Sequence, residues 1–179
     1  MEGQNSDEND KKYFFGEVLE SVAIAVVLAF IIRFFLFQPF YIPTGSMEPV
    51  LTKGDRIIVS KIHYRLDNPA RGDIVVFKYP IDPDRDFVKR VIGLPGETLE
   101  IRDSMLYING EFVEQPFLSP GLKYGSYGPV TIPQGHYFMM GDNRNNSEDS
   151  RFWGMLPQEN IIGKTLLIYW PLNRVQLLR

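Results

Sequence analysis

A serine in a constrained turn is the first residue in this sequence that could do chemistry. Ser46 lies in the run Pro43-Thr44-Gly45-Ser46-Met47-Glu48-Pro49, shortly after the long apolar run of the chain. Gly45 lets the backbone turn without a steric penalty, and the two flanking prolines stiffen the segment. Such a turn would hold the hydroxyl in one orientation, as a nucleophile requires, but an ordinary Gly-Ser turn has the same composition.

A lysine among apolar residues could supply the base that this serine would need. A serine hydroxyl is a poor nucleophile until a base takes its proton, and a lysine can do so only if burial lowers its pKa toward working pH. In the predicted strand 86–92, Phe87, Lys89 and Val91 share one face because strand side chains alternate. Lys89 is therefore the candidate base, although a lysine that extends from a sheet into solvent gives the same pattern.

A polar stretch late in the chain contains groups that could orient a buried cation. Residues 141–151 include the hydroxyl of Ser147, the carboxylates of Asp142 and Asp149, and Arg151, which could pair with one of them. The same composition is typical of a surface loop.

The composition excludes several other kinds of site. The chain has 179 residues and a formal net charge of -3, which gives no basic surface for nucleic acid. It contains no cysteine, so disulfides, thiolate metal sites and a cysteine nucleophile are excluded. His63 and His136 are the two histidines, and we interpret both as structural. We expect no metal and no cofactor.

An apolar run near the N-terminus predicts a membrane anchor. Residues 13–37 are mostly apolar, and residues 21–32 carry no charge. About 20 helical residues at about 1.5 Å each span roughly 30 Å, the hydrocarbon thickness of a bilayer. A cleaved signal peptide would have a shorter apolar core followed by small residues, whereas this run ends in bulky ones. A buried globular helix is the other alternative.

Flanking charges predict the orientation of this anchor. Lys11 and Lys12 precede it, which favours a cytoplasmic N-terminus. Arg33, near its far end, weakens the asymmetry without reversing it. The predicted parts are a cytoplasmic tail at 1–12, a transmembrane anchor at 13–37 and an extracytoplasmic β domain at 38–179.

The region after the anchor is predicted to be mainly β. Short runs rich in β-branched and aromatic residues are separated by Gly and Pro, and no stretch has a helical period. Asn109-Gly110 predicts a two-residue hairpin, and the Gly/Ser/Tyr-rich segment 118–128 predicts a mobile loop. We expect a single antiparallel, barrel-like β domain. The predicted strands are 56–60, 73–78, 86–92, 98–101, 105–108, 111–113, 136–140 and 161–170.

Four stretches together resemble type I signal peptidases, the membrane-anchored serine endopeptidases that remove signal peptides from exported proteins. Ser46-Met47-Glu48-Pro49 is similar to the nucleophile box of that family, and residues 89–96 are similar to its lysine box. Residues 141–151 are similar to its distal box, and residues 72–77 to the strand that lies against the substrate. Four such motifs in order behind an N-terminal anchor are a specific combination.

The resemblance implies a role for each of the candidate residues. Ser46 would attack the scissile carbonyl, and Lys89 would be the general base, the Ser-Lys variant of the catalytic triad. Thr44 stands where the family commonly has a serine that helps the Ser46 backbone N–H bind the oxyanion. Ser147 would hydrogen-bond and orient Lys89.

The resemblance also implies structural ion pairs, a substrate and a location. Asp149 with Arg151, and Asp142 with Arg90, would brace the site. The substrates would be signal peptides with small residues at positions -1 and -3, cut by an enzyme of the plasma (inner) membrane whose further partner is the lipid bilayer. The implied substrate-binding residues are Gln38, Pro39, Phe40, Tyr41, Ile42, Pro43, Met47, Leu51 and Val88.

Two alternatives belong to other classes. A non-catalytic, membrane-anchored β domain that binds exported chains would keep its function without Ser46 and Lys89. A self-cleaving Ser-Lys protease of the LexA-like repressor group would need a DNA-binding domain where this chain has an apolar run.

Overall fold

The computed structural model describes residues 3–31 and 36–178. By its internal contacts the chain forms two compact units, residues 1–37 and residues 38–179. Each unit is described by itself.

The first unit is one long helix, α1 (Gly3–Ile31), of 29 residues. Ala, Val, Leu and Glu predominate in its second half, and the hydroxyl of Ser21 donates to the carbonyl of Glu17, one turn earlier, at 2.8 Å. The apolar side chains from Val18 to Phe30 are largely exposed. Within the described part of the chain, no helix has the length and hydropathy of a membrane span. Residues 32–35 of the predicted anchor lie outside the described residues.

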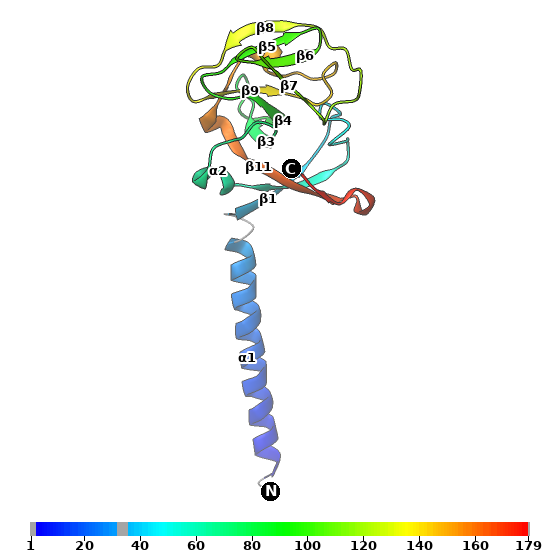
Figure 1. Ribbon diagram of the computed structural model, residues 1–179. Helices are drawn as coiled ribbons and strands as arrows, with labels where there is room; N and C mark the ends of the chain where they lie inside the picture. The colour runs from blue at the N-terminus through cyan, green and yellow to red at the C-terminus, as the bar shows by residue number, and fades with distance from the viewer. Residues whose placement is uncertain (1–2, 32–35, 179) are drawn as a thin grey trace. The chain divides into compact units, whose positions relative to one another are not determined.

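The second unit consists of two antiparallel sheets, as the sequence predicts for its fold class (Figure 1). The larger sheet has the strand order β1-β2-β11-β3-β4-β9-β10, with β12 paired to β11, and the smaller sheet has the order β7-β6-β5-β8. The strands of the larger sheet are β1 (Phe37–Tyr41), β2 (Arg56–Ser60), β3 (Ile74–Lys78), β4 (Asp86–Gly93), β9 (His136–Met140), β10 (Leu156–Pro157), β11 (Ile161–Trp170) and β12 (Gln176–Leu177). Those of the smaller sheet are β5 (Thr98–Arg102), β6 (Met105–Ile108), β7 (Glu111–Val113) and β8 (Tyr127–Thr131).

The predicted hairpin is confirmed. Asn109 and Gly110 both have positive φ, 53° and 85°, as a type I′ turn requires, and Ile108 pairs with Glu111 across it. The turn joins β6 to β7.

The sequence pattern does not predict strand β8. It contains Gly128 and Pro129, which weaken the signal for a strand, and it pairs on one side with β5 as an edge of the smaller sheet. The last two residues of the predicted loop 118–128 are therefore strand.

Short helices were also missed. They are α2 (His63–Leu66), α3 (Ser150–Trp153), and the 3-10 turns η2 (Gln158–Asn160) and η3 (Leu172–Arg174). Elements of three or four residues are too short to show a helical period.

Three apolar clusters form the core of the second unit. One of them packs Ile42, Met47 and Leu51 against residues of β2, β3 and β11 such as Ile57 and Val76. A second fills the space between the smaller sheet and β4 and β9, and a third packs aromatic side chains against β3, β4 and β9. The first cluster fixes the segment that carries Ser46.

Candidate active site

The Ser46 turn is held by its two apolar neighbours. Met47 and Leu51 are 1% and 0% exposed, and the Leu51 N–H donates to the Met47 carbonyl at 2.9 Å. The Glu48 N–H donates to the Gly45 carbonyl at 3.2 Å. Ser46 itself is half-buried at the edge of a cavity, so its hydroxyl is both fixed and reachable.

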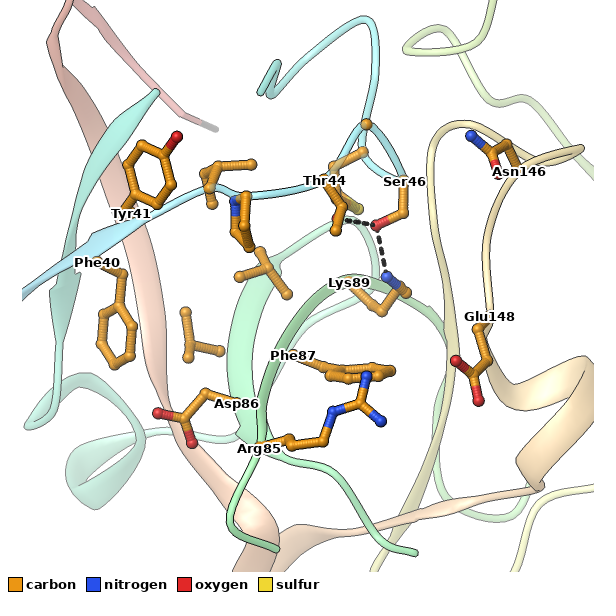
Figure 2. A pocket seen from close by; sticks show the side chains of 16 residues that line it. Phe40, Tyr41, Thr44, Ser46, Arg85, Asp86, Phe87, Lys89, Asn146 and Glu148 are labelled. Atoms are coloured by element: carbon orange, nitrogen blue, oxygen red, sulfur yellow. Dashed lines mark hydrogen bonds between the residues drawn. The ribbon is translucent and has the colours of Figure 1, made fainter. Parts of the chain in front are cut away.

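Lys89 lies on β4 and points at that hydroxyl. Its Nζ donates a hydrogen bond to Ser46 Oγ at 2.7 Å, and Figure 2 shows the two side chains facing each other. Lys89 is 4% exposed and lies 5.4 Å from the centre of the Phe87 ring, the neighbour on its own strand face. The Thr44 hydroxyl lies 3.5 Å from Ser46 Oγ.

Burial changes the proton affinity of this lysine. Desolvation lowers the pKa of Lys89 from 10.5 to about 8, while the negative charges of Asp149, Glu148 and Asp142 oppose that shift. Burial is the larger effect because it removes the ammonium from water, whereas none of these carboxylates forms an ion pair with it among the described residues. At mildly alkaline pH, a sizeable fraction of Lys89 is therefore neutral and able to accept a proton.

Arg90 and Asp142 form a buried ion pair on the other face of β4. The guanidinium meets both carboxylate oxygens, Nε to Oδ1 at 2.8 Å and Nη2 to Oδ2 at 2.6 Å. Arg90 also donates to the Gly72 carbonyl at 2.7 Å. The pair joins β4 to the segment that follows β9.

Asp149 and Arg151 form the second ion pair, with Nε 2.8 Å from Oδ1. Asp149 is fully buried and caps helix α3, accepting from the backbone N–H of Arg151 at 3.3 Å, and it accepts from the N–H of Gly141 at 3.1 Å. Arg151 also donates to the Arg144 carbonyl at 2.7 Å. This carboxylate therefore closes segment 141–151 on itself.

Segment 141–151 contacts the backbone of the serine turn directly. The Asn143 N–H donates to the Ser46 carbonyl at 3.1 Å, and its side-chain amide donates to the Gly45 carbonyl at 3.0 Å. A side chain at Gly141 would collide with the Ser46 carbonyl oxygen and with Ser147. Glycine at this position is thus a requirement of the close approach.

Ser147 is buried beside this contact, but the expected hydrogen bond to Lys89 is not formed. Its hydroxyl has no hydrogen-bond partner among the described residues. The orienting role of Ser147 stays a prediction.

The cavity beside Ser46 and Lys89 has a volume of about 540 Å³. Six of the nine predicted substrate-binding residues line it: Phe40, Tyr41, Ile42, Pro43, Met47 and Val88. Gln38 and Pro39 lie earlier on β1 and do not line it, and Leu51 is buried in the core behind it.

Further lining residues were not among the predicted site residues. They are Gly45, Val76, Arg85, Asp86, Phe87, Asn146 and Glu148. Phe87 shares the strand face of Lys89, so its alternation with the lysine was a usable signal. Glu148 directly follows Ser147 and accepts a hydrogen bond at 2.8 Å from the hydroxyl of Tyr79, the residue after β3. No pattern in the neighbouring sequence indicates this contact.

An aromatic stack supports the floor of this cavity. The rings of Tyr79 and Phe87 are parallel with centroids 4.3 Å apart, and the Arg85 guanidinium lies 5.1 Å from the Phe87 ring. Figure 2 shows Phe87 between Lys89 and Arg85, with Glu148 on the opposite side of the cavity from Phe40 and Tyr41. Across residues 3–31 and 36–178, no group of three acidic or histidine side chains could hold a metal ion.

Known proteins similar to this chain were found by sequence and by structure. The family model described as "Signal peptidase, peptidase S26" matches residues 15–170. A "Probable signal peptidase I-2" of Synechocystis is 42% identical over 90% of this chain and 76% of that protein. The "Signal peptidase I" of Bacillus licheniformis is 40% identical over 93% of this chain and 95% of that protein. A crystal structure of a signal peptidase I from Enterococcus faecalis V583 is 36% identical, with a TM-score of 0.49, over 55% of this chain and 97% of that chain.

The family match covers most of the chain, and it includes the serine turn, β4 and segment 141–151, which meet around one cavity. The chain belongs to the signal peptidase I family, the S26 serine peptidases that cleave signal peptides from exported proteins.

Proposed function

We propose that Ser46 is the nucleophile of this signal peptidase and Lys89 its general base. The observation that carries the proposal is the 2.7 Å contact between Lys89 Nζ and Ser46 Oγ inside a buried environment that lowers the pKa of the lysine to about 8. A base must lie within hydrogen-bond reach of the proton that it takes and must have a pKa near working pH.

The proton path follows from this contact. Neutral Lys89 takes the hydroxyl proton as Ser46 Oγ attacks the scissile carbonyl, and the resulting ammonium returns the proton to the leaving amine. A water molecule, activated by the Lys89 amine, then hydrolyses the acyl-enzyme. The Ser46 N–H and the Thr44 hydroxyl would bind the oxyanion, because Thr44 Oγ1 already lies 3.5 Å from the attacking oxygen.

The cavity supports a preference for small residues at positions -1 and -3 of the signal peptide. Ile42, Met47 and Val88 give it apolar walls near the nucleophile, which suit small apolar substrate side chains. Residues 38–41 belong to β1, the edge of the larger sheet, and an edge strand can pair with an extended peptide.

The remaining predicted residues would act through the position of this pair. Asp142 with Arg90 would hold β4 against segment 141–151, and Asp149 with Arg151 would keep that segment folded. Ser147, buried beside Gly141 with a hydroxyl that has no other partner among the described residues, would hydrogen-bond and orient Lys89. No cofactor or metal takes part in this proposed mechanism.

A membrane arrangement completes the proposal. The signal peptidase I family is membrane-associated, and an uncharged apolar segment in α1 supports an anchor at 13–37, with a cytoplasmic tail at 1–12 and an extracytoplasmic catalytic domain at 38–179. The enzyme would sit in the plasma (inner) membrane as a single-pass protein, where the cleavage site of a signal peptide leaves the bilayer. The anchor would then raise the effective concentration of substrate at the site.

The test is cleavage of a detergent-solubilised preprotein that carries an Ala-x-Ala sequence. Ser46→Ala and Lys89→Ala should each reduce the rate by about 10³-fold or more, because they remove groups that act as a unit. Lys53→Ala, which changes an exposed lysine near the same turn, is the matched control and should cleave as the wild type does. Circular dichroism must show that all variants are folded. A folded Lys89→Ala variant with near-normal activity would disprove the proposed base.

A further inference from the structure

The segment between β7 and β8 has no part in the chemistry described so far, yet it contacts the supports of the site. Gln115, Phe117 and Tyr124 of this segment face two buried arginines, Arg90 and Arg144. The composition of residues 118–128 predicts a mobile loop for most of it.

The first contact is with Arg90 of the Arg90–Asp142 ion pair, on the face of β4 opposite Lys89. The Arg90 guanidinium lies 4.0 Å from the centre of the Phe117 ring, while its edge is occupied by Asp142 and the Gly72 carbonyl. Arg90 is 3% exposed, so the ring covers the face of the cation that would otherwise meet water. Arg90 directly follows Lys89 on β4.

The second contact is with an arginine that has no ion pair among the described residues. Arg144 is 2% exposed, and burial lowers its pKa. Its Nη2 donates to the side-chain oxygen of Gln115, and its guanidinium lies 4.9 Å from the Tyr124 ring and 5.9 Å from the Phe117 ring. A buried cation without a carboxylate partner depends on such neutral acceptors and ring faces.

The segment is fixed at its far end as well. The Gln115 amide donates to the Tyr124 hydroxyl at 3.1 Å, and the Asn145 amide donates to the Lys123 carbonyl at 3.0 Å. These two bonds close the segment on itself and tie it to segment 141–151.

Arg144 connects these contacts to the nucleophile. Its Nε donates to the Gly141 carbonyl at 3.1 Å, and Gly141 packs against the carbonyl of Ser46. Asn143, directly before Arg144, donates to the carbonyls of Ser46 and Gly45. A displacement of Arg144 would therefore displace the groups that hold the Ser46 turn.

We infer that residues 115–124 are a brace for the active site, in which Gln115 and Phe117 are positioning residues for signal-peptide cleavage. They act through Arg144 and Arg90 and do not touch the substrate cavity. The inference rests on the proposed Ser46-Lys89 mechanism.

The test is the steady-state kinetics of the full chain in detergent with the Ala-x-Ala preprotein. Phe117→Leu and Gln115→Leu should each lower kcat by about 10-fold to 100-fold and leave KM within about threefold, because misplacement of about 1 Å is costly for chemistry but not for binding at a separate surface. Phe117→Tyr keeps the ring and Gln115→Glu keeps an acceptor oxygen, so both should retain a near-normal kcat.

A matched control comes from β6 of the smaller sheet. Tyr107→Leu removes another arginine–aromatic contact, in which the Arg102 guanidinium lies 3.8 Å from the Tyr107 ring, but this contact has no connection to segment 141–151. It should lower thermal stability without lowering kcat.

Two results would overturn the inference. The first is that Phe117→Leu and Gln115→Leu have the same kcat as Tyr107→Leu when all three lose the same amount of melting temperature. The second is that Phe117→Tyr and Gln115→Glu lower kcat as much as the Leu variants do. An active Ser46→Ala variant would instead count against the proposed mechanism, so the two failures are distinguishable.

Discussion

At Lys89, the neutral state that a base needs conflicts with the stability of the fold. As the proposed base it must be neutral in part at working pH, and the structure favours this by burying it beside Phe87 and Ser46. Burial penalises the ammonium in the folded protein only, because the unfolded chain leaves the lysine in water. The group proposed to activate Ser46 should therefore destabilise the fold.

The sign of this effect follows from the pKa values. The pKa of Lys89 falls from 10.5 to about 8 on folding, so below pH 8 the lysine is charged in both states and the full penalty is present. Between about pH 8 and 10.5 the folded protein loses the proton first, and the penalty disappears as pH rises. The free energy of unfolding of the wild type should therefore gain from this group across that window.

We predict that Lys89→Met stabilises the folded protein at pH 7. A shift from 10.5 to about 8 corresponds to about 3 kcal/mol, the upper limit of the gain before the lost hydrogen bond to Ser46 is counted. Denaturant unfolding in detergent at pH 7 and at pH 10.5 measures it, and the difference between variant and wild type should shrink at the higher pH. A less stable variant at pH 7 would contradict the prediction.

At the scale of the elements, the site depends on how closely segment 141–151 approaches the serine turn. Gly141 lies where a side chain would meet the Ser46 carbonyl oxygen and Ser147, and the backbone of Asn143 donates to the same carbonyl. The two segments cannot separate without moving the nucleophile away from Lys89.

Gly141→Ala should therefore lower kcat by about 100-fold through displacement of Ser46. The measurement is single-turnover cleavage of the Ala-x-Ala preprotein. Gly16→Ala, at a position where an added Cβ meets nothing within 4 Å, is the control and should be neutral. Normal cleavage by a folded Gly141→Ala variant would show that this contact does not position the serine.

Local signals were strong enough to predict most strands and the pieces of the site. Alternation along β4 put Lys89 on the face of Phe87, and Asn109-Gly110 predicted its turn because few other residues tolerate two successive positive φ angles. Strand β8 gave no such signal, since Gly128 and Pro129 interrupt it and pairing with β5 alone makes it a strand.

The contacts between segments could not be predicted in the same way. Gln115 and Arg144 lie far apart in the sequence, and neither has a local pattern that names its partner. The lining residues Arg85 and Glu148 were missed for the same reason, because both occur in polar stretches typical of surface loops. The brace at 115–124 is visible only once the fold brings it against the arginines.

For the molecule as a whole, the proposed anchor would make the enzyme a membrane protein in which α1 holds the protein in the bilayer and the β domain carries the proposed active site. The side chains of Val22, Val26, Val27 and Leu28 are exposed on α1. Lipid would bury this apolar surface, and a charged residue near the middle of a membrane helix costs about 2.5 to 3.5 kcal/mol.

A double variant, Val26→Asp with Leu28→Asp, should therefore move the protein from the membrane pellet to the supernatant after alkaline extraction. Leu66→Asp, which changes an exposed apolar residue of α2 in the β domain, should leave the protein in the pellet. Equal retention of the double variant and the wild type would contradict an anchor in this segment.

The central claim is that Lys89 can be neutral when it faces Ser46, and the most direct measurement is its titration. Carbon-13 labelling of the lysine side chains in the full, detergent-solubilised chain, with the Lys89 signal assigned by its loss in Lys89→Met, gives the pKa by NMR. We predict a pKa of about 8, well below the 10.5 of an ordinary lysine. A value near 10.5 would mean that Lys89 is charged at working pH and would contradict its role as the base.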